Sequence, residues 1–224
     1  MVFSRKLTKE EVAIIEKLIL FVEDKHHREE GHDYSHILEV TRNSIEIAHM
    51  IKDKVDPFVL ICGALLHDIG RVEAPSGLFH GIDGASRAEE ILKAQIDDEE
   101  TIIKIIRIVV RHSPESMIPP VTTEEKLVYD ADTLDRLGYI GMARGFMGKK
   151  GTIHSILTDR IERRMQDYHK LNYEESKRFG KKLHEETLRI VSEMKSALKK
   201  RYKDIMEIES YKLILEEEAK QKKK

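Results

Sequence analysis

The chain has 224 residues, and its 39 Lys and Arg nearly balance its 41 Asp and Glu, so the formal net charge is −2. This length is enough for one domain with a substantial core, and the charge balance gives no electrostatic reason to expect binding to nucleic acid or to a membrane surface. The single cysteine, Cys62, excludes an intramolecular disulfide and a cysteine-rich zinc module, and it suits a reducing cytoplasm. Any metal must therefore be held by histidines and carboxylates.

The N-terminal residues pass quickly into charged sequence, so we expect no signal peptide and a cytoplasmic location. No stretch approaches the roughly 20 apolar residues that a membrane-spanning helix needs. Charged residues make up 36% of the chain, whereas Asn occurs only at 43 and 172 and Gln only at 95, 166 and 221. This bias is typical of heat-adapted proteins.

Apolar residues recur at spacings of three and four along most of the chain, which predicts an all-α fold. The first predicted helix begins near Thr8, which forms a capping box with Glu11. The second begins around Asp33 or Ser35. His36 is therefore expected in the first turn of the second helix.

The third predicted helix is apolar on nearly every side. Asp56 and Pro57 are typical of an N-cap and a first helical residue, the helix covers 58–69, and Gly70 ends it. A helix with no polar face must lie at the centre of the fold.

Three more helices are predicted between residues 86 and 137. Ser86, with Glu89 three residues later, indicates the start of a fourth helix. A fifth covers 99–112 and is rich in Ile and Val, and a sixth runs from a cap at Thr122 to Leu137.

Glycines punctuate residues 138–151, where we expect a connection between helices. Two more helices are predicted at about 153–169 and 173–203, followed by a charged tail at 216–224. Because the chain has no internal repeat, linker or break in composition, we expect a single domain. A C-terminal helical extension at about 152–215 would pack on the rest of the chain or on another subunit.

The strongest local signal for chemistry is the adjacent pair His67 and Asp68, at the end of the most apolar helix. An unpaired ionisable group there costs several kcal/mol, so the pair must be hydrogen-bonded, ion-paired or bound to a metal. A satisfied buried dyad would explain the pair equally well. However, His36 opens an earlier helix and Asp132 lies in a later one, so three helices could enclose one ion. Imidazole and carboxylate together favour Mn, Fe, Co, Ni or Zn over an all-oxygen Mg or Ca site.

These residues also carry a resemblance to a known family. The segments that carry it are His32-Asp33-Tyr34-Ser35-His36, Leu66-His67-Asp68-Ile69-Gly70-Arg71 and Asp130-Ala131-Asp132-Thr133-Leu134-Asp135-Arg136-Leu137-Gly138. In this order they resemble the HD-domain superfamily of metal-dependent phosphohydrolases, over about residues 30–140. The run through 140–144 is similar to a subgroup of uncharacterised microbial HD hydrolases. The resemblance implies an HD-type helical bundle with additional C-terminal helices, in which His36, His67, Asp68 and Asp132 bind metal.

Asp130 and Asp132 compete for the role of the last ligand. Residues two apart on a helix point about 200° apart, so both cannot face one ion. Asp132 occupies the Ala-Asp-x-Leu setting seen in relatives and is the predicted ligand, whereas Asp130 would be a cap, a support for a ligand or a surface residue. Asp135 shares the face of Asp132 and is predicted to bind substrate or a neighbouring side chain.

Two further histidines suggest a second ion. His80 precedes the predicted fourth helix, and His112 ends the fifth. In HD relatives with two metals, extra histidines complete the second site and the Asp of the pair often bridges, so the resemblance extends to a six-ligand arrangement. Its members are His36, His67, Asp68, His80, His112 and Asp132. The alternative is that His80 binds phosphate and His112 caps its helix.

The implied activity is hydrolysis of a phosphoester or phosphoanhydride bond in a small phosphorylated metabolite, and family frequency favours a nucleotide. One or two divalent transition-metal ions would lower the pKa of a bound water, which Asp68 would bridge or position. Arg71 is the predicted phosphate clamp because its planar group offers a fork of donors. Lys149 is a further substrate-binding candidate, and Arg111, Arg144 and Lys150 are weaker ones.

Two rival functions use the same residues. Some HD proteins with six such ligands hold two irons and oxidise their substrates with O₂. Alternatively, a metal would only stabilise the core of an interaction protein whose charged C-terminal helices engage a partner. The sequence leaves the native metal, the substrate and homo-oligomer formation open.

Overall fold

The structure is a computed structural model that describes residues 3–27, 32–72, 80–147 and 150–221. This part of the chain is almost entirely helical, as the spacing of apolar residues predicts, and the only extended pairing within it is an isolated bridge between Phe3 and Val55. The longer helices are α1 (Lys9–His26), α2 (Tyr34–Ala48), α3 (Pro57–Leu66), α4 (His80–Lys93), α5 (Glu99–Arg111), α6 (Thr123–Asp135), α7 (Gly138–Phe146) and α10 (Glu174–Gln221). The short helical segments are η1 (Ile69–Arg71), η3 (Pro114–Ser116), α8 (Ile153–Ile156), η4 (Leu157–Ile161), α9 (Glu162–Asp167) and η5 (Tyr168–Lys170).

The predicted starts of the first, third and sixth helices are confirmed by their caps. Thr8 and Glu11 form a reciprocal capping box at α1, and Thr122 and Glu125 form another at α6. The Asp56 carboxylate accepts hydrogen bonds from two backbone N–H groups in the first turn of α3. These side chains satisfy N–H groups that a helix start leaves without an intrahelical partner.

Helix α3 lies at the centre of the core, as its apolar sequence predicts. It packs against α1, α2, α5 and α6, and every one of its residues except Ile61 is buried. The C-terminal end of α3 therefore delivers the residues that follow it, His67 and Asp68, into the interior of the protein.

The fourth helix begins six residues before the predicted start at Ser86, because α4 starts at His80. Two glycines permit close packing at this point. A Cβ atom on Gly84 would lie 3.0 Å from the Val109 side chain of α5, and one on Gly70 would lie 2.6 Å from the Gly84 nitrogen. Glycine lets α4 approach both α5 and η1, and this approach places His80 beside the end of α3.

Residues 138–146 form a helix, α7, so the expectation of a connection over the whole glycine-punctuated segment is wrong. The following helix runs from Ile153 to Lys170, close to the predicted 153–169, but it contains a π-helical turn, η4. Residues 148 and 149 lie outside the described part of the chain.

The last helix, α10, continues to Gln221, well past the predicted end near 203 and into the predicted charged tail. After Gly180 its sequence contains no Gly or Pro, and charges at i and i+4 spacing, such as Lys203 and Glu207 at 3.9 Å, support a helix exposed to water.

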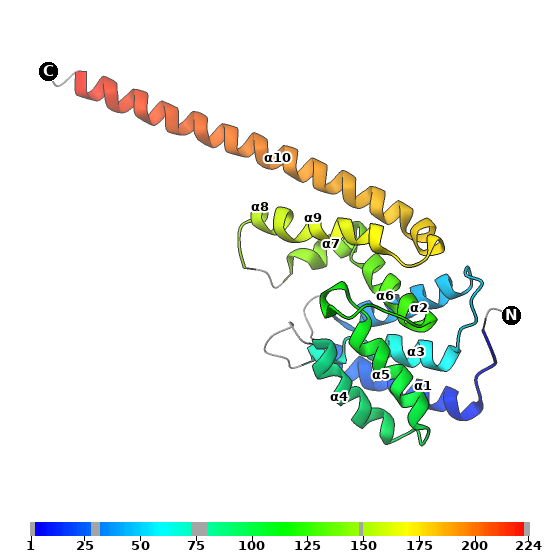
Figure 1. Ribbon diagram of the computed structural model, residues 1–224. Helices are drawn as coiled ribbons and strands as arrows, with labels where there is room; N and C mark the ends of the chain where they lie inside the picture. Colours follow the sequence, from blue (N-terminus) through cyan, green and yellow to red (C-terminus); the bar gives the residue numbers. More distant parts are fainter. Residues whose placement is uncertain (1–2, 28–31, 73–79, 148–149, 222–224) are drawn as a thin grey trace.

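The C-terminal helices form a layer over the core built from α1 to α6. In Figure 1, α7, α8 and α9 lie between α10 and the other helices, and the far end of α10 projects beyond the rest of the molecule. The layer has a small apolar cluster of its own, made of Met142, Leu157, Ile161, Met165 and Val191. Among the described helices, none combines the length and apolar character needed to cross a membrane.

Candidate metal centre

The six predicted ligands come together at one end of the core. His36 lies in the first turn of α2, His67 is the C-cap of α3 and is followed by Asp68, His80 opens α4, His112 is the C-cap of α5 and Asp132 lies in the last turns of α6. Each of them has at most 3% of its surface exposed. So many buried ionisable groups would be strongly unfavourable unless they satisfy one another or bind an ion.

The Asp68 carboxylate stands between two pairs of histidines. Its Oδ2 lies 3.3 Å from His36 Nε2 and 3.6 Å from His67 Nε2. Its Oδ1 lies 3.3 Å from His112 Nε2 and 3.6 Å from His80 Nε2. Each oxygen therefore faces one pair, which is the geometry of a carboxylate that bridges two neighbouring positions.

Within each pair of histidines, the two Nε2 atoms lie close together. The Nδ1–H groups of His67 and His112 donate to backbone carbonyl oxygens three residues earlier, at 2.7 and 2.8 Å, so in the neutral rings Nε2 carries the lone pair. These Nε2 atoms lie 3.2 Å from those of His36 and His80, respectively. Ring nitrogens so close together, beside ionised carboxylates, are a donor set suited to a divalent transition metal.

The charge states of His67, Asp68 and Asp132 agree with this chemistry. Burial lowers the pKa of His67 to about 3, which keeps its ring neutral. Burial alone would raise the pKa of Asp68, but the charge of Arg71 and the neighbouring histidines hold it well below its usual range. The pKa of Asp132 is likewise lowered, against burial, mainly by the charge of Arg136. The site thus combines a neutral imidazole with ionised carboxylates, the forms that bind metal.

Asp132 joins the first pair of histidines, whereas Asp130 does not. One oxygen of Asp132 lies 3.6 Å from His36 Nε2, and His36, His67 and Asp132 form one of three groups whose ligand atoms lie within 4.8 Å of each other. The Asp130 carboxylate instead accepts hydrogen bonds from the backbone N–H groups of Asn172 and Tyr173, just before α10.

Asp135 supports His36 from behind. Its carboxylate accepts a hydrogen bond of 2.7 Å from His36 Nδ1–H and is also ion-paired with Arg144 of α7. A carboxylate behind an imidazole fixes the ring and leaves the other nitrogen for a metal. Asp33 caps α2 by accepting from the backbone N–H of His36 at 3.1 Å.

Of the candidates for phosphate binding, some lie in the site and others lie away from it. Arg71 lies in the site, where its Nε–H donates to Asp68 Oδ1 at 2.9 Å. Arg111 reaches the carbonyl oxygen of Pro119, and Lys150 lines a separate cavity described below. Lys149 lies outside the described residues.

Sequence reasoning missed two residues that contact the predicted ligands. His32 Nδ1 lies 2.6 Å from Asp68 Oδ2, and His32, His36 and Asp68 form a further group able to hold an ion. Burial lowers the pKa of His32 to about 4. Arg136 donates to Asp132 and to Ser113. Arg136 stands four positions after Asp132 at the end of α6, a spacing that could have indicated it.

Comparison with known proteins agrees with this geometry. The HD-domain family model matches residues 33–137. The uncharacterised protein YpgQ of Bacillus subtilis is 31% identical over 144 residues, which cover 63% of this chain and 68% of YpgQ.

Three solved structures share the fold. The crystal structure of B. subtilis YpgQ in complex with ADP matches with a TM-score of 0.65 and 22% identity, over 84% of this chain and 96% of YpgQ. The Lin1889 protein of Listeria innocua gives 0.63 and 25%, over 84% and 97%. An HD-superfamily hydrolase of Bacillus thuringiensis gives 0.62 and 22%, over 84% and 98%.

Family model, relative, fold and buried His and Asp groups lead to the same class. The chain belongs to the HD-domain family.

Proposed function

We propose that this protein hydrolyses a phosphoester or phosphoanhydride bond in a nucleotide, using one or two divalent transition-metal ions. His36, His67 and Asp132 would hold one ion, His80 and His112 would hold the other, and Asp68 would contact both. The observation that carries this proposal is the position of the Asp68 carboxylate, with one oxygen 3.3 Å from His36 and the other 3.3 Å from His112.

A bound ion of this kind supplies a water of lowered pKa and neutralises charge on the phosphoryl group. Other residues of the chain set the charge and the orientation of the predicted metal ligands. Arg136 and Arg71 keep Asp132 and Asp68 ionised, and Asp135 fixes the ring of His36. Arg71 has its guanidinium beside the Asp68 carboxylate and the His80 ring, which supports our expectation that it binds a phosphoryl oxygen.

The choice of a nucleotide is supported by YpgQ, whose crystal structure contains ADP. YpgQ is also the relative that shares 31% identity with this chain over 144 residues. Asp68 and Arg71 are the residues that we expect to act directly on the bound substrate, and Asp135 and Lys149 remain predicted contributors to its binding.

A hydrolysis screen with matched variants tests the proposal. Wild-type protein should release phosphate or pyrophosphate from members of a nucleotide panel only when metal is present, and His67→Ala and Asp68→Ala should reduce this release to background. His49→Ala and Asp83→Ala make the same substitutions at exposed positions and should retain activity. Metal-independent release that survives in the two site variants would contradict the proposal.

Two further measurements separate the rival functions. Iron content near two equivalents with substrate-dependent O₂ consumption would replace the proposal with an oxygenase. A metal-loaded protein that leaves every nucleotide intact but captures a defined macromolecule through α10 would replace it with an interaction protein.

A further inference from the structure

A cavity of about 450 Å³ lies in the C-terminal layer, between Lys150 and the helical segments α8, η4 and α9. Known small-molecule sites have volumes of about 300–1,000 Å³. The residues that line this cavity are Lys150, Ser155, Ile156, Asp159, Arg160, Arg163 and Arg164. None of them belongs to the three groups of the metal centre. We call it the basic cavity.

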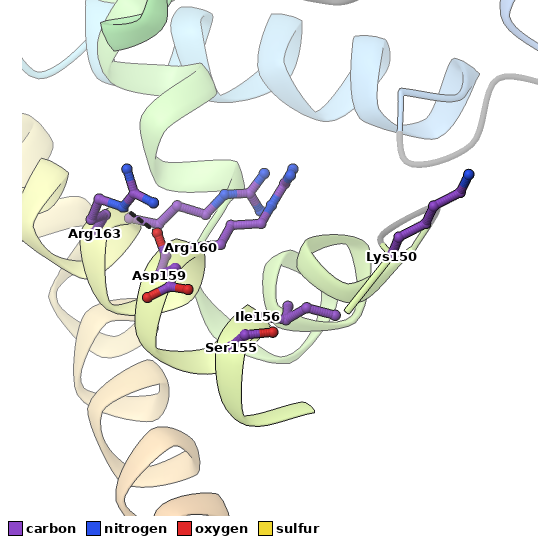
Figure 2. A pocket seen from close by; sticks show the side chains of 7 residues that line it. Lys150, Ser155, Ile156, Asp159, Arg160 and Arg163 are labelled. Atoms are coloured by element: carbon purple, nitrogen blue, oxygen red, sulfur yellow. Dashed lines mark hydrogen bonds between the residues drawn. The ribbon is translucent and has the colours of Figure 1, made fainter. Parts of the chain in front are cut away.

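Positive charge dominates the basic cavity. Four of its lining residues, Lys150, Arg160, Arg163 and Arg164, are cationic, and Asp159 is the one acid. Figure 2 shows the side chains of Lys150 and Arg160 extending to the same side, away from the α10 ribbon. Like charges gathered in a concave surface concentrate their field there and attract anions. Three guanidinium groups favour phosphate in particular, because each offers a fork of donors that matches two phosphate oxygens.

The wall of the basic cavity has an unusual local structure. The π-helical turn η4 supplies Asp159 and Arg160, and its ends are held by Leu157 and Ile161, both buried. A π turn inserts an extra residue into a helix and so redirects the side chains around it, and such turns are frequent at functional sites. Arg163, one turn on, donates to the backbone carbonyl oxygen of Asp159 (Figure 2).

Helix α7 joins the basic cavity to the metal centre. A Cβ atom on Gly145 would lie 3.2 Å from the Arg164 guanidinium and 2.4 Å from Ile161, so this glycine is where the cavity wall rests on α7. The preceding residue, Arg144, is ion-paired with Asp135, the carboxylate that holds His36. The lining residue Arg164 is thus connected through α7 to Asp135, the carboxylate that holds the predicted metal ligand His36.

We propose that the basic cavity binds the phosphate groups of a small phosphorylated molecule, separately from the metal centre. The charge, the volume and the local structure of the basic cavity support a binding site. Only the link between its ligand and the catalysed reaction rests on the proposed function. The ligand is either the distal part of the substrate or a second phosphorylated molecule, and both use the same phosphate recognition.

Calorimetric titration with inorganic tripolyphosphate tests the site. Full-length protein would be compared with Lys150→Gln/Arg163→Gln, which changes two exposed cavity residues and so avoids disturbing the core. The control, Arg178→Gln/Lys181→Gln, also removes two positive charges, but from an exposed part of α10. Metal content is measured in all three proteins.

We expect the cavity variant to bind tripolyphosphate about tenfold or more weakly, or to lose one binding event, while the control binds like wild type. Arg160→Gln should show the same loss. Equal affinity and stoichiometry in wild type and both cavity variants would overturn the proposal. Because this readout is binding, its failure is distinct from failure of nucleotide hydrolysis in the His67→Ala and Asp68→Ala comparison.

Kinetics then identify the source of the phosphate. A raised KM for nucleotide with unchanged kcat in Lys150→Gln/Arg163→Gln assigns the cavity to the substrate. An unchanged KM, with wild-type activity altered by added tripolyphosphate and the cavity variant insensitive to it, assigns it to a second ligand. Both outcomes support the site, whereas a cavity variant that matches the control in KM and in its response to tripolyphosphate contradicts it.

Discussion

Asp130 and Asp132 are two residues apart on α6 and serve opposite sides of that helix. Asp132 faces His36 and is held by Arg136. Asp130 faces α10, where it accepts backbone hydrogen bonds of 2.8 and 3.1 Å from Asn172 and Tyr173. We therefore predict a metal-binding role for Asp132 and a structural role for Asp130.

Alanine substitutions separate the two roles. We expect Asp132→Ala to lose bound metal and activity, because a ligand is removed. Asp130→Ala should keep its metal but unfold more easily, by about 1–3 kcal/mol, because two backbone N–H groups lose the buried carboxylate that accepts their hydrogen bonds. Elemental analysis and urea unfolding of both variants check this. Full metal content in Asp132→Ala, or metal loss in a folded Asp130→Ala, would reverse the assignment.

At the residue scale, an ordered motif in the sequence predicts which distant residues lie close together in the fold. His36, His67, Asp68 and Asp132 are the positions that the family resemblance selects, and they lie together. His32 was missed because it precedes the N-cap of α2, where helical periodicity no longer says which way a side chain points. Only tertiary packing brings it to Asp68.

At the element scale, glycines explain two of the differences between predicted and observed helices, the early start of α4 and the presence of α7. A glycine in sequence suggests a break, but in α4 and α7 it permits close contact between helices. The caps, by contrast, depend on local hydrogen bonds within four residues, and for this reason the capping signals at Thr8, Asp56 and Thr122 predict the helix starts correctly.

Gly180 provides a test of this close packing. On an isolated helix, Gly→Ala stabilises by about 1 kcal/mol. In α10, however, a Cβ atom would lie 2.1 Å from the Leu134 side chain, which is fully buried in α6. We expect Gly180→Ala to destabilise the protein by about 1–3 kcal/mol through overpacking. Lys182→Ala, at an exposed neighbouring position, is the control for thermal unfolding, and a Gly180→Ala protein that melts above wild type would refute the contact.

The start of α1 gives a pH-dependent prediction. Hydrogen bonds from Arg5 lower the pKa of Glu11 below its usual 4.5. This contribution is therefore present above pH 4.5 and is lost as the pH falls through the lowered pKa.

Glu11→Gln should cost about 0.5–1 kcal/mol at pH 7, because the ion pair is partly exposed. The amide oxygen can still accept from Thr8 N–H, so the cap is retained. Urea unfolding of both proteins should give free energies of unfolding whose difference is constant above pH 4.5 and shrinks as the pH falls from 4.5 towards 3. A difference that stays constant over this range would show that the charge of Glu11 is not its cause.

At the scale of the whole molecule, the metal centre joins elements that are distant in the chain. Its predicted ligands come from α2, the end of α3, α4, the end of α5 and α6. An ion that binds only the folded state stabilises it by mass action, by about 4 kcal/mol when present at roughly a thousand times its Kd. The length of α10 and the joining of the C-terminal layer to the core through α7 could not be read from helical periodicity, because they depend on which faces meet.

Chelation tests this stabilising role. Treatment with EDTA followed by dialysis should lower the melting temperature, and added Mn²⁺ should restore it. In Asp68→Ala the melting temperature should respond much less to either treatment. Equal responses in wild type and Asp68→Ala would mean that the ion binds elsewhere.

The central claim is that Asp68 shares metal with the histidines on either side of it. Elemental analysis of protein saturated with Mn²⁺ and then dialysed tests it most directly, with wild type, Asp68→Ala and the exposed control Asp83→Ala measured side by side. We predict one to two equivalents per chain in wild type and Asp83→Ala, and less than half of that in folded Asp68→Ala. Undiminished metal in Asp68→Ala would contradict the claim.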